Sequence, residues 1–265
     1  MRLVSIASGS SGNCIYIGTD NTHILVDVGI SNKRIEQGLN EIGIKGSELD
    51  GVVITHEHSD HVKGLGVLAR KHGIPIYGTK ETWKEIETMK YLGEYPKELF
   101  SPILPDTEFS IGDMKIEPFR IDHDAANPVA YRISNTYKSV AVVTDLGHFD
   151  QYIIEHLQRL DALLLESNHD VRMLETGPYP YYLKQRILSD YGHLSNDNAG
   201  KLLNYILHDK MKYILLGHLS KENNYEKLAY ETVKLEIDQG DHKYQSKDFC
   251  ISVAKRDMMS EIVTI

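Results

Sequence analysis

Four potential metal ligands lie within six residues of this chain, directly after a short apolar run. Residues 56–61 read His-Glu-His-Ser-Asp-His, and residues 52–55 read Val-Val-Ile-Thr. The β-branched run predicts a buried strand, and the residues after 61 have the pattern of a helix. The ligand types would then occupy the turn at the carboxyl end of a strand, where active sites collect in α/β sheets. This feature predicts an α/β fold with a functional site at one sheet edge.

The spacing of these four side chains predicts two metal positions. Alternate side chains of an extended chain point to the same side, so His56 and His58 can reach one ion together. A turn at Ser59 would redirect Asp60 and His61 towards a second ion. Imidazole and carboxylate ligands suit zinc, manganese and iron, so the residue types do not select among these metals.

Length and composition limit the class of protein. The 265 residues are 41% hydrophobic and 25% charged, as in an ordinary globular protein with one large domain or two small ones. No apolar stretch approaches the length that crosses a bilayer, and the N-terminus lacks the apolar core of a secretory signal. Two cysteines, Cys14 and Cys250, cannot form a disulfide framework. We therefore expect a cytoplasmic protein without membrane contact.

The formal net charge of −9 bears on the choice of partner. It argues against an extended basic surface for non-specific binding of nucleic acid. A phosphodiester substrate stays compatible with this charge, because bound metal ions can supply local positive charge.

Groups of strands and helices alternate along the chain. We predict strands at residues 3–7, 14–18, 23–28, 51–55, 74–78, 108–111, 114–122, 130–134, 139–144, 162–166, 213–216 and 248–254. Helices are predicted at residues 32–42, 62–72, 81–91, 151–160, 195–208 and 225–237, with a loop at 93–105. Turn residues between the first three strands predict hairpins. This order predicts an α/β (αββα) fold, with two packed mixed β-sheets between outer helices, as a single domain over residues 1–265.

Three later strands end at further ligand types. His123, Asp145 and His218 each follow a predicted strand directly or within one or two residues. A single polar residue at such a place is more often a turn or cap residue than a ligand. Together with residues 56–61, the three make a much stronger pattern.

This series of ligands resembles the metallo-β-lactamase superfamily over nearly the whole chain. The resemblance implies the metallo-β-lactamase fold and two divalent metal ions. It implies a first ion bound by His56, His58 and His123, and a second bound by Asp60, His61 and His218. Asp145 would bridge the two ions, because a carboxylate has two oxygens.

Two further residues resemble a motif pair of the transfer-RNA 3′-processing endonucleases of this superfamily. Glu166 follows an apolar strand, and His193 precedes a predicted helix. By resemblance, Glu166 would orient His193, which would protonate the leaving oxygen, so Asp60, Glu166 and His193 are the predicted catalytic residues. The alternatives are that Glu166 only caps its strand and that His193 only stabilises the start of its helix.

Several whole segments, such as Gly-His-Leu-Ser-Asn at residues 192–196, resemble the YycJ/WalJ branch of the superfamily. The resemblance implies an exonuclease that degrades double-stranded DNA from the 5′ end and acts in mismatch repair. The main alternative is a metal-dependent hydrolase of a small ester, thioester or lactone on the same scaffold. A non-catalytic binding module is disfavoured because all seven ligand positions are filled.

The partner that these features predict is DNA with a 5′ phosphate. We predict substrate contacts from Ser10, Ser11 and Asn13, in a Gly/Ser turn whose backbone N–H groups can face an anion. His169 is a further predicted contact, with a buried structural role as its alternative. Lys184 and Arg186 are alternative phosphate anchors or a solvated surface. Oligomeric state is not readable from the sequence, and a homo-oligomer stays open.

Overall fold

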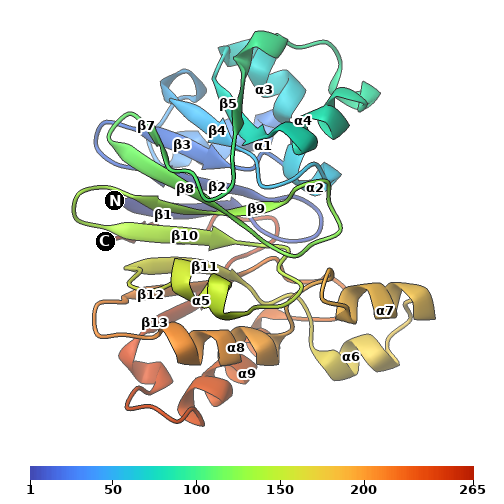
Figure 1. Cartoon of the computed structure of the whole chain (residues 1–265), viewed down its shortest axis with the longest axis vertical. Coiled ribbons are helices and arrows are strands. Elements are labelled where there is room, and N and C mark those ends of the chain that lie inside the picture. The colour runs from blue at the N-terminus through green and yellow to red at the C-terminus, as the bar shows by residue number, and fades with distance from the viewer.

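The computed structural model describes residues 1–265 as two seven-stranded mixed sheets that pack face to face (Figure 1). The first sheet has the order β14-β1-β2-β3-β4-β5-β6, and the second has the order β13-β12-β11-β10-β9-β8-β7. The first sheet consists of β1 (Arg2–Ala7), β2 (Cys14–Gly18), β3 (His23–Val26), β4 (Gly51–Val53), β5 (Ile76–Thr79), β6 (Phe100–Ile103) and β14 (Val263–Thr264). The second consists of β7 (Phe109–Ile111), β8 (Met114–Arg120), β9 (Val129–Ser134), β10 (Ser139–Val143), β11 (Ala162–Glu166), β12 (Tyr213–Gly217) and β13 (Cys250–Val253).

Both sheets begin with antiparallel hairpins and continue with parallel strands. Strands β1 to β3 and β7 to β10 form the antiparallel parts. Strands β3 to β6 and β10 to β13 run parallel, so their carboxyl ends meet at one edge of each sheet. The predicted hairpins at the start of the chain are confirmed.

Helices cover the outer face of each sheet (Figure 1). The helices are α1 (Asn32–Glu41), α2 (Ser59–Val62), α3 (Leu65–His72), α4 (Lys80–Glu87), α5 (Gln151–His156), α6 (Val171–Thr176), α7 (Tyr181–Leu188), α8 (Asn196–Ile206) and α9 (Glu226–Asp238). Helices α1, α3 and α4 pack on the first sheet in one apolar cluster. Helices α5, α8 and α9 pack on the second sheet in another. No helix has the length and apolar character that spanning a membrane requires.

A third apolar cluster lies between the sheets. It joins side chains such as Leu3 and Ile15 of the first sheet to Tyr131 and Val142 of the second. These positions lie in strands buried on both faces, which explains why the strands read as continuous apolar runs. The predicted αββα arrangement of two mixed sheets between outer helices is therefore confirmed.

The structure differs from the predicted elements in several places, and the two-residue strand β14 is one element that was not predicted. The predicted loop at 93–105 contains the edge strand β6. The predicted helix at 62–72 is two helices, α2 and α3, because the chain bends at Gly64, whose N–H bonds the Val28 carbonyl at 2.7 Å. The short helices α6 and α7, which project beside the second sheet in Figure 1, were not among the predicted elements.

Candidate metal centre

The predicted ligands come from loops at the carboxyl ends of strands in both sheets. Residues 56–61 follow β4 in the first sheet, whereas His123, Asp145 and His218 follow β8, β10 and β12 in the second. In the second sheet, Val143 pairs with Leu165, and Leu165 pairs with Leu216, so the ends of β10, β11 and β12 lie level. This register brings residues that are far apart in the sequence to one edge.

All seven predicted ligands meet there. Ligand atoms within 4.8 Å of one another form a group of His56, His58 and His123 and a group of Asp60, His61 and His218. Asp145 lies close to both, in a group with His56 and His61 and in a group with His218, Glu166 and His193. The arrangement is consistent with a dinuclear metal site.

Several of these ligand atoms lack hydrogen-bond partners, which also fits two metal ions. His56 Nε2, Asp145 Oδ2 and both ring nitrogens of His218 are buried and make no hydrogen bond. Asp145 Oδ2 nevertheless lies 3.2 Å from His61 Nε2 and 3.2 Å from His218 Nδ1. Buried polar atoms without partners are costly, and divalent cations coordinated by them would remove this cost.

Asp27, directly after β3, was not among the predicted site residues. Its Oδ2 lies 2.8 Å from His61 Nδ1, and its two oxygens accept hydrogen bonds from the N–H and hydroxyl of Thr55 at 2.9 and 2.8 Å. A carboxylate on Nδ1 favours the tautomer in which the lone pair of His61 Nε2 can bind metal. The available signal was its position, because Asp27 lies in an apolar run that ends at the same sheet edge.

Three residues of the centre have left-handed backbone conformations. Asp27, Asp145 and His218 have φ angles of +60°, +59° and +54°. Such values are uncommon for residues other than glycine and collect at functional sites, where the surroundings hold them. For His218 the surroundings include Ser8, whose Oγ accepts from its N–H at 2.9 Å, and Asn168, whose Nδ2 donates to its carbonyl at 2.9 Å.

Backbone contacts from two loops hold Asp60 and His61. The Asn13 N–H donates to the Asp60 carbonyl at 2.8 Å, and the Val28 N–H donates to the His61 carbonyl at 2.8 Å. The Asn13 side chain is buried, accepts from the Gly9 N–H at 3.0 Å and lies 3.1 Å from His61 Nε2. Its carboxamide is thus turned into the protein, which fits support of the ligand loop better than the predicted substrate contact.

Glu166 and His193 form a close pair beside Asp145. Glu166 Oε1 lies 2.8 Å from His193 Nδ1, and its Oε2 accepts from the N–H groups of Leu146 and Leu194 at 2.8 and 3.1 Å. Burial alone would raise the pKa of Glu166, but the imidazole of His193 holds this pKa below its ordinary value. The carboxylate therefore stays charged and orients the ring, leaving His193 Nε2 without a protein partner.

The remaining predicted contacts differ in exposure. Ser10 and Ser11 are exposed. His169 is buried, makes no hydrogen bond through either ring nitrogen, and has its pKa lowered to about 4 by burial, so the ring is neutral. Lys184 donates to the carbonyls of Glu175 and Gly177, and Arg186 pairs with Asp124. The cations of α7 are therefore engaged within the protein.

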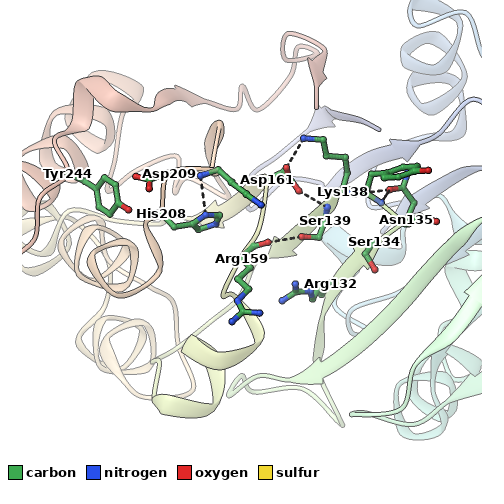
Figure 2. A pocket seen from close by; sticks show the side chains of 13 residues that line it. Arg132, Ser134, Asn135, Lys138, Ser139, Arg159, Asp161, His208, Asp209 and Tyr244 are labelled. Atoms are coloured by element: carbon green, nitrogen blue, oxygen red, sulfur yellow. Dashed lines mark hydrogen bonds and ion pairs between the residues drawn. The ribbon is translucent and has the colours of Figure 1, made fainter.

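A surface hollow of about 590 Å³ lies at the opposite end of the second sheet (Figure 2). Its lining includes Lys138, Ser139, Arg159 and Asp161, around the starts of β10 and β11. The Asp161 carboxylate accepts hydrogen bonds from Lys138 Nζ at 2.8 Å and from the Ser139 N–H at 3.0 Å. These contacts hold the starts of β10 and β11 together. None of the clustered ligands lines this hollow, so the metal centre is the candidate functional site.

A family model described as "Beta-lactamase superfamily domain" matches residues 22–214. The chain belongs to the metallo-β-lactamase superfamily. This member is similar to the exodeoxyribonuclease WalJ of Streptococcus pneumoniae, at 43% identity over 236 residues that cover 89% of this chain and 88% of the relative. It is also similar to the exodeoxyribonuclease YycJ of Bacillus anthracis, at 40% identity over 237 residues that cover 88% of each chain. The resemblance to the YycJ/WalJ branch is confirmed.

Solved structures support the fold of this superfamily member. The metallo-β-lactamase fold protein YhfI from Bacillus subtilis matches 98% of this chain and 100% of its own length, with a TM-score of 0.69 at 18% identity. With the family match and the buried His/Asp cluster, the chain is a metal-dependent hydrolase of the superfamily.

Proposed function

We propose that this hydrolase is a cytoplasmic exodeoxyribonuclease that degrades double-stranded DNA in the 5′-to-3′ direction and acts in DNA repair. The observation that carries the proposal is the Glu166–His193 pair, 2.8 Å apart and beside the ligand cluster. A proton donor placed there suits a reaction whose leaving group is a poor one, such as the 3′ oxygen of a nucleotide. The similarity to WalJ and YycJ supports DNA as the substrate.

The ligand set assigns the residues that would hold two ions. His56, His58 and His123 would hold one, Asp60, His61 and His218 the other, and Asp145 would contact both. When bound, two ions of zinc, manganese or iron supply Lewis-acid charge to the phosphodiester and to the attacking water.

The protein residues would orient the substrate and the ligands and would supply the proton to the leaving oxygen. Asp60 is 22% exposed at its side chain, so this carboxylate contributes the outermost ligand of its group. Burial alone would raise the pKa of Asp60, but His61 and His218 lower it below its ordinary value, and the group is charged. Glu166 holds Nδ1 of His193, and Nε2 of His193 gives its proton to the 3′ oxygen as the bond from phosphorus to that oxygen breaks.

Substrate contacts and organisation complete the proposal. Ser10 and Ser11 would contact the 5′ phosphate, and His169 would contact a phosphate after a local movement of its buried ring. We also propose that residues 1–265 form a single domain, because one apolar cluster joins the two sheets.

The decisive experiment is a metal-by-substrate matrix. Metal-stripped protein is reloaded with Zn²⁺ or Mn²⁺ and tested on 5′-phosphorylated duplex DNA, single-stranded DNA, RNA and a chromogenic thioester. We expect metal-dependent release of nucleotides from the duplex, and loss of this activity in Asp145→Ala with the fold retained by circular dichroism. Cleavage of the thioester alone would replace the proposal by a small-molecule hydrolase.

A further inference from the structure

We infer that Arg256 and the loop formed by residues 8–12 make a subsite for a phosphate monoester, the 5′ phosphate at a DNA end. The inference rests on the proposed nuclease function and names a residue that selects the substrate end. Arg256 follows β13, and its guanidinium contacts Leu219, the residue directly after the ligand His218.

Two contacts fix the guanidinium of Arg256. Its Nη2 donates to the Leu219 carbonyl at 2.9 Å, and its Nη1 lies 3.5 Å from Ser10 Oγ. Leu219 directly follows the metal ligand His218, and consecutive Cα atoms are about 3.8 Å apart, so the guanidinium lies beside the loop that carries this ligand. A terminal phosphate bound there would be next to the ligands that hold the bond to be cleaved.

The charge of Arg256 is not neutralised within the protein. No carboxylate lies within 4.0 Å of it, and the next acid in the chain, Asp257, pairs with Arg34 at 3.4 Å. A guanidinium has five N–H donors in a planar fork, and the two contacts to the protein leave others free. Arginine in this state favours a phosphate, which accepts two parallel hydrogen bonds from the fork.

The loop is shaped to receive the guanidinium. A side chain at Gly9 would place its Cβ 3.1 Å from Arg256 Nη1 and 3.3 Å from the Leu219 carbonyl oxygen. Gly9 also has a φ of +154°, which side chains rarely adopt. The absent side chain therefore leaves the space in which Arg256 lies over the loop.

The loop adds further free donors. The N–H groups of Ser8, Gly9 and Gly12 are bonded to Lys255 O, Asn13 Oδ1 and Gly9 O. In contrast, the N–H groups of Ser10 and Ser11 make no hydrogen bond, and both residues are exposed. Successive free N–H groups in a turn of small residues form an anion-binding surface. A monoester, which carries about −1.5 to −2 charge at neutral pH, gains more from these donors than a diester does.

The test compares two duplexes that differ only in a 5′ phosphate or a 5′ hydroxyl on the cleaved strand. We expect the wild type to have the lower KM for the phosphorylated end. Arg256→Gln should raise that KM about tenfold to hundredfold, the range for a lost charged hydrogen bond, with little change in kcat. Arg256→Lys, which keeps the charge but loses the fork, should keep part of the preference.

Arg159→Gln is the matched control. Arg159, like Arg256, has no acidic partner, but it is exposed and lines the hollow of Figure 2 at the other end of the sheet. This variant should keep the preference of the wild type. Equal loss of preference in Arg159→Gln and Arg256→Gln would mean that overall charge acts and would overturn the subsite.

Binding is measured separately with metal-free protein, which cannot cleave, by fluorescence anisotropy on the same two duplexes. Selective binding of the phosphorylated end by the wild type and its loss in Arg256→Gln support the subsite, even if the metal-loaded protein cleaves no DNA. If the wild type cleaves both ends with equal KM and Arg256→Gln behaves identically, the subsite is refuted while the nuclease function stands.

Discussion

At the scale of single residues, the proposed reaction depends on Glu166, a buried carboxylate that would act on the substrate only through His193. Glu166 accepts from two backbone N–H groups and holds His193 at 2.8 Å. In Glu166→Gln the amide lacks the charge and replaces one acceptor by a donor, so His193 loses the carboxylate that orients its Nδ1. We expect kcat on duplex DNA to fall about a hundredfold or more.

A substrate with a better leaving group distinguishes a role of Glu166 in proton donation from a structural role. A thymidine 5′-phosphate ester of p-nitrophenol releases an oxygen that needs no proton, so Glu166→Gln should cleave this ester at close to the rate of the wild type. Steady-state kinetics on both substrates checks the prediction. An equal loss on DNA and on the nitrophenyl ester would show that Glu166 only supports the fold of the centre.

At the scale of elements, the ligand loop depends on close contact between three turns. Gly29, in the turn after β3, donates to the Asn13 carbonyl at 2.7 Å, and a Cβ there would lie 1.6 Å from the Asp60 carbonyl oxygen. Gly29→Ala must therefore displace the loop that carries Asp60 and His61. We expect a destabilisation of about 1–3 kcal/mol and loss of bound metal, measured by urea denaturation and by elemental analysis.

Gly78→Ala in β5 is the control for that substitution. A Cβ at Gly78 would meet its nearest atom, Ile54 Cβ, at 3.6 Å, which is an ordinary contact. This variant should bind the same amount of metal as the wild type. Full metal occupancy in Gly29→Ala would contradict the proposed dependence of the ligand loop on this turn.

At the scale of the whole molecule, the two sheets carry one cysteine each in opposite environments. Cys14 is fully buried under the helices of the first sheet, whereas Cys250 is exposed on β13. Burial raises the pKa of the Cys14 thiol, so it stays neutral and protected at pH 8. We expect iodoacetamide to modify one thiol, Cys250, in the native protein and both thiols in urea, as counted by mass spectrometry.

Removal of the metal ions by a chelator should also change the reactivity of Cys14, because the metal ligands come from both sheets. Ions held by residues 56–61 and by His123, Asp145 and His218 would link the sheets, and binding to the folded state alone stabilises it. Modification of Cys14 should become faster after chelation, with a lower Tm. Equal reactivity of both thiols in the metal-loaded protein would contradict the packing of the first sheet.

The sequence by itself determined most of the strands, the ligand types at their ends and the family. These features depend on short-range patterns, since a buried strand requires an apolar run and a metal pair requires several His and Asp residues in few positions. The edge strand β6 was not predicted because it contains Pro102 and has one buried residue. An edge strand tolerates such a pattern, since one side of its backbone has no partner strand.

Only the tertiary structure decided which residues support the centre. Asp27 reaches His61 across 34 positions, and Arg256 reaches the Ser10 loop across 246. Asp27 carries only the weak signal of its place at a strand end, and Arg256 carries none, because an acid after a strand or an arginine near a terminus is common in any chain. These contacts form because the two sheets pack and bring distant turns to one edge. Burial and nearby charges at that edge then determine what each side chain can bind.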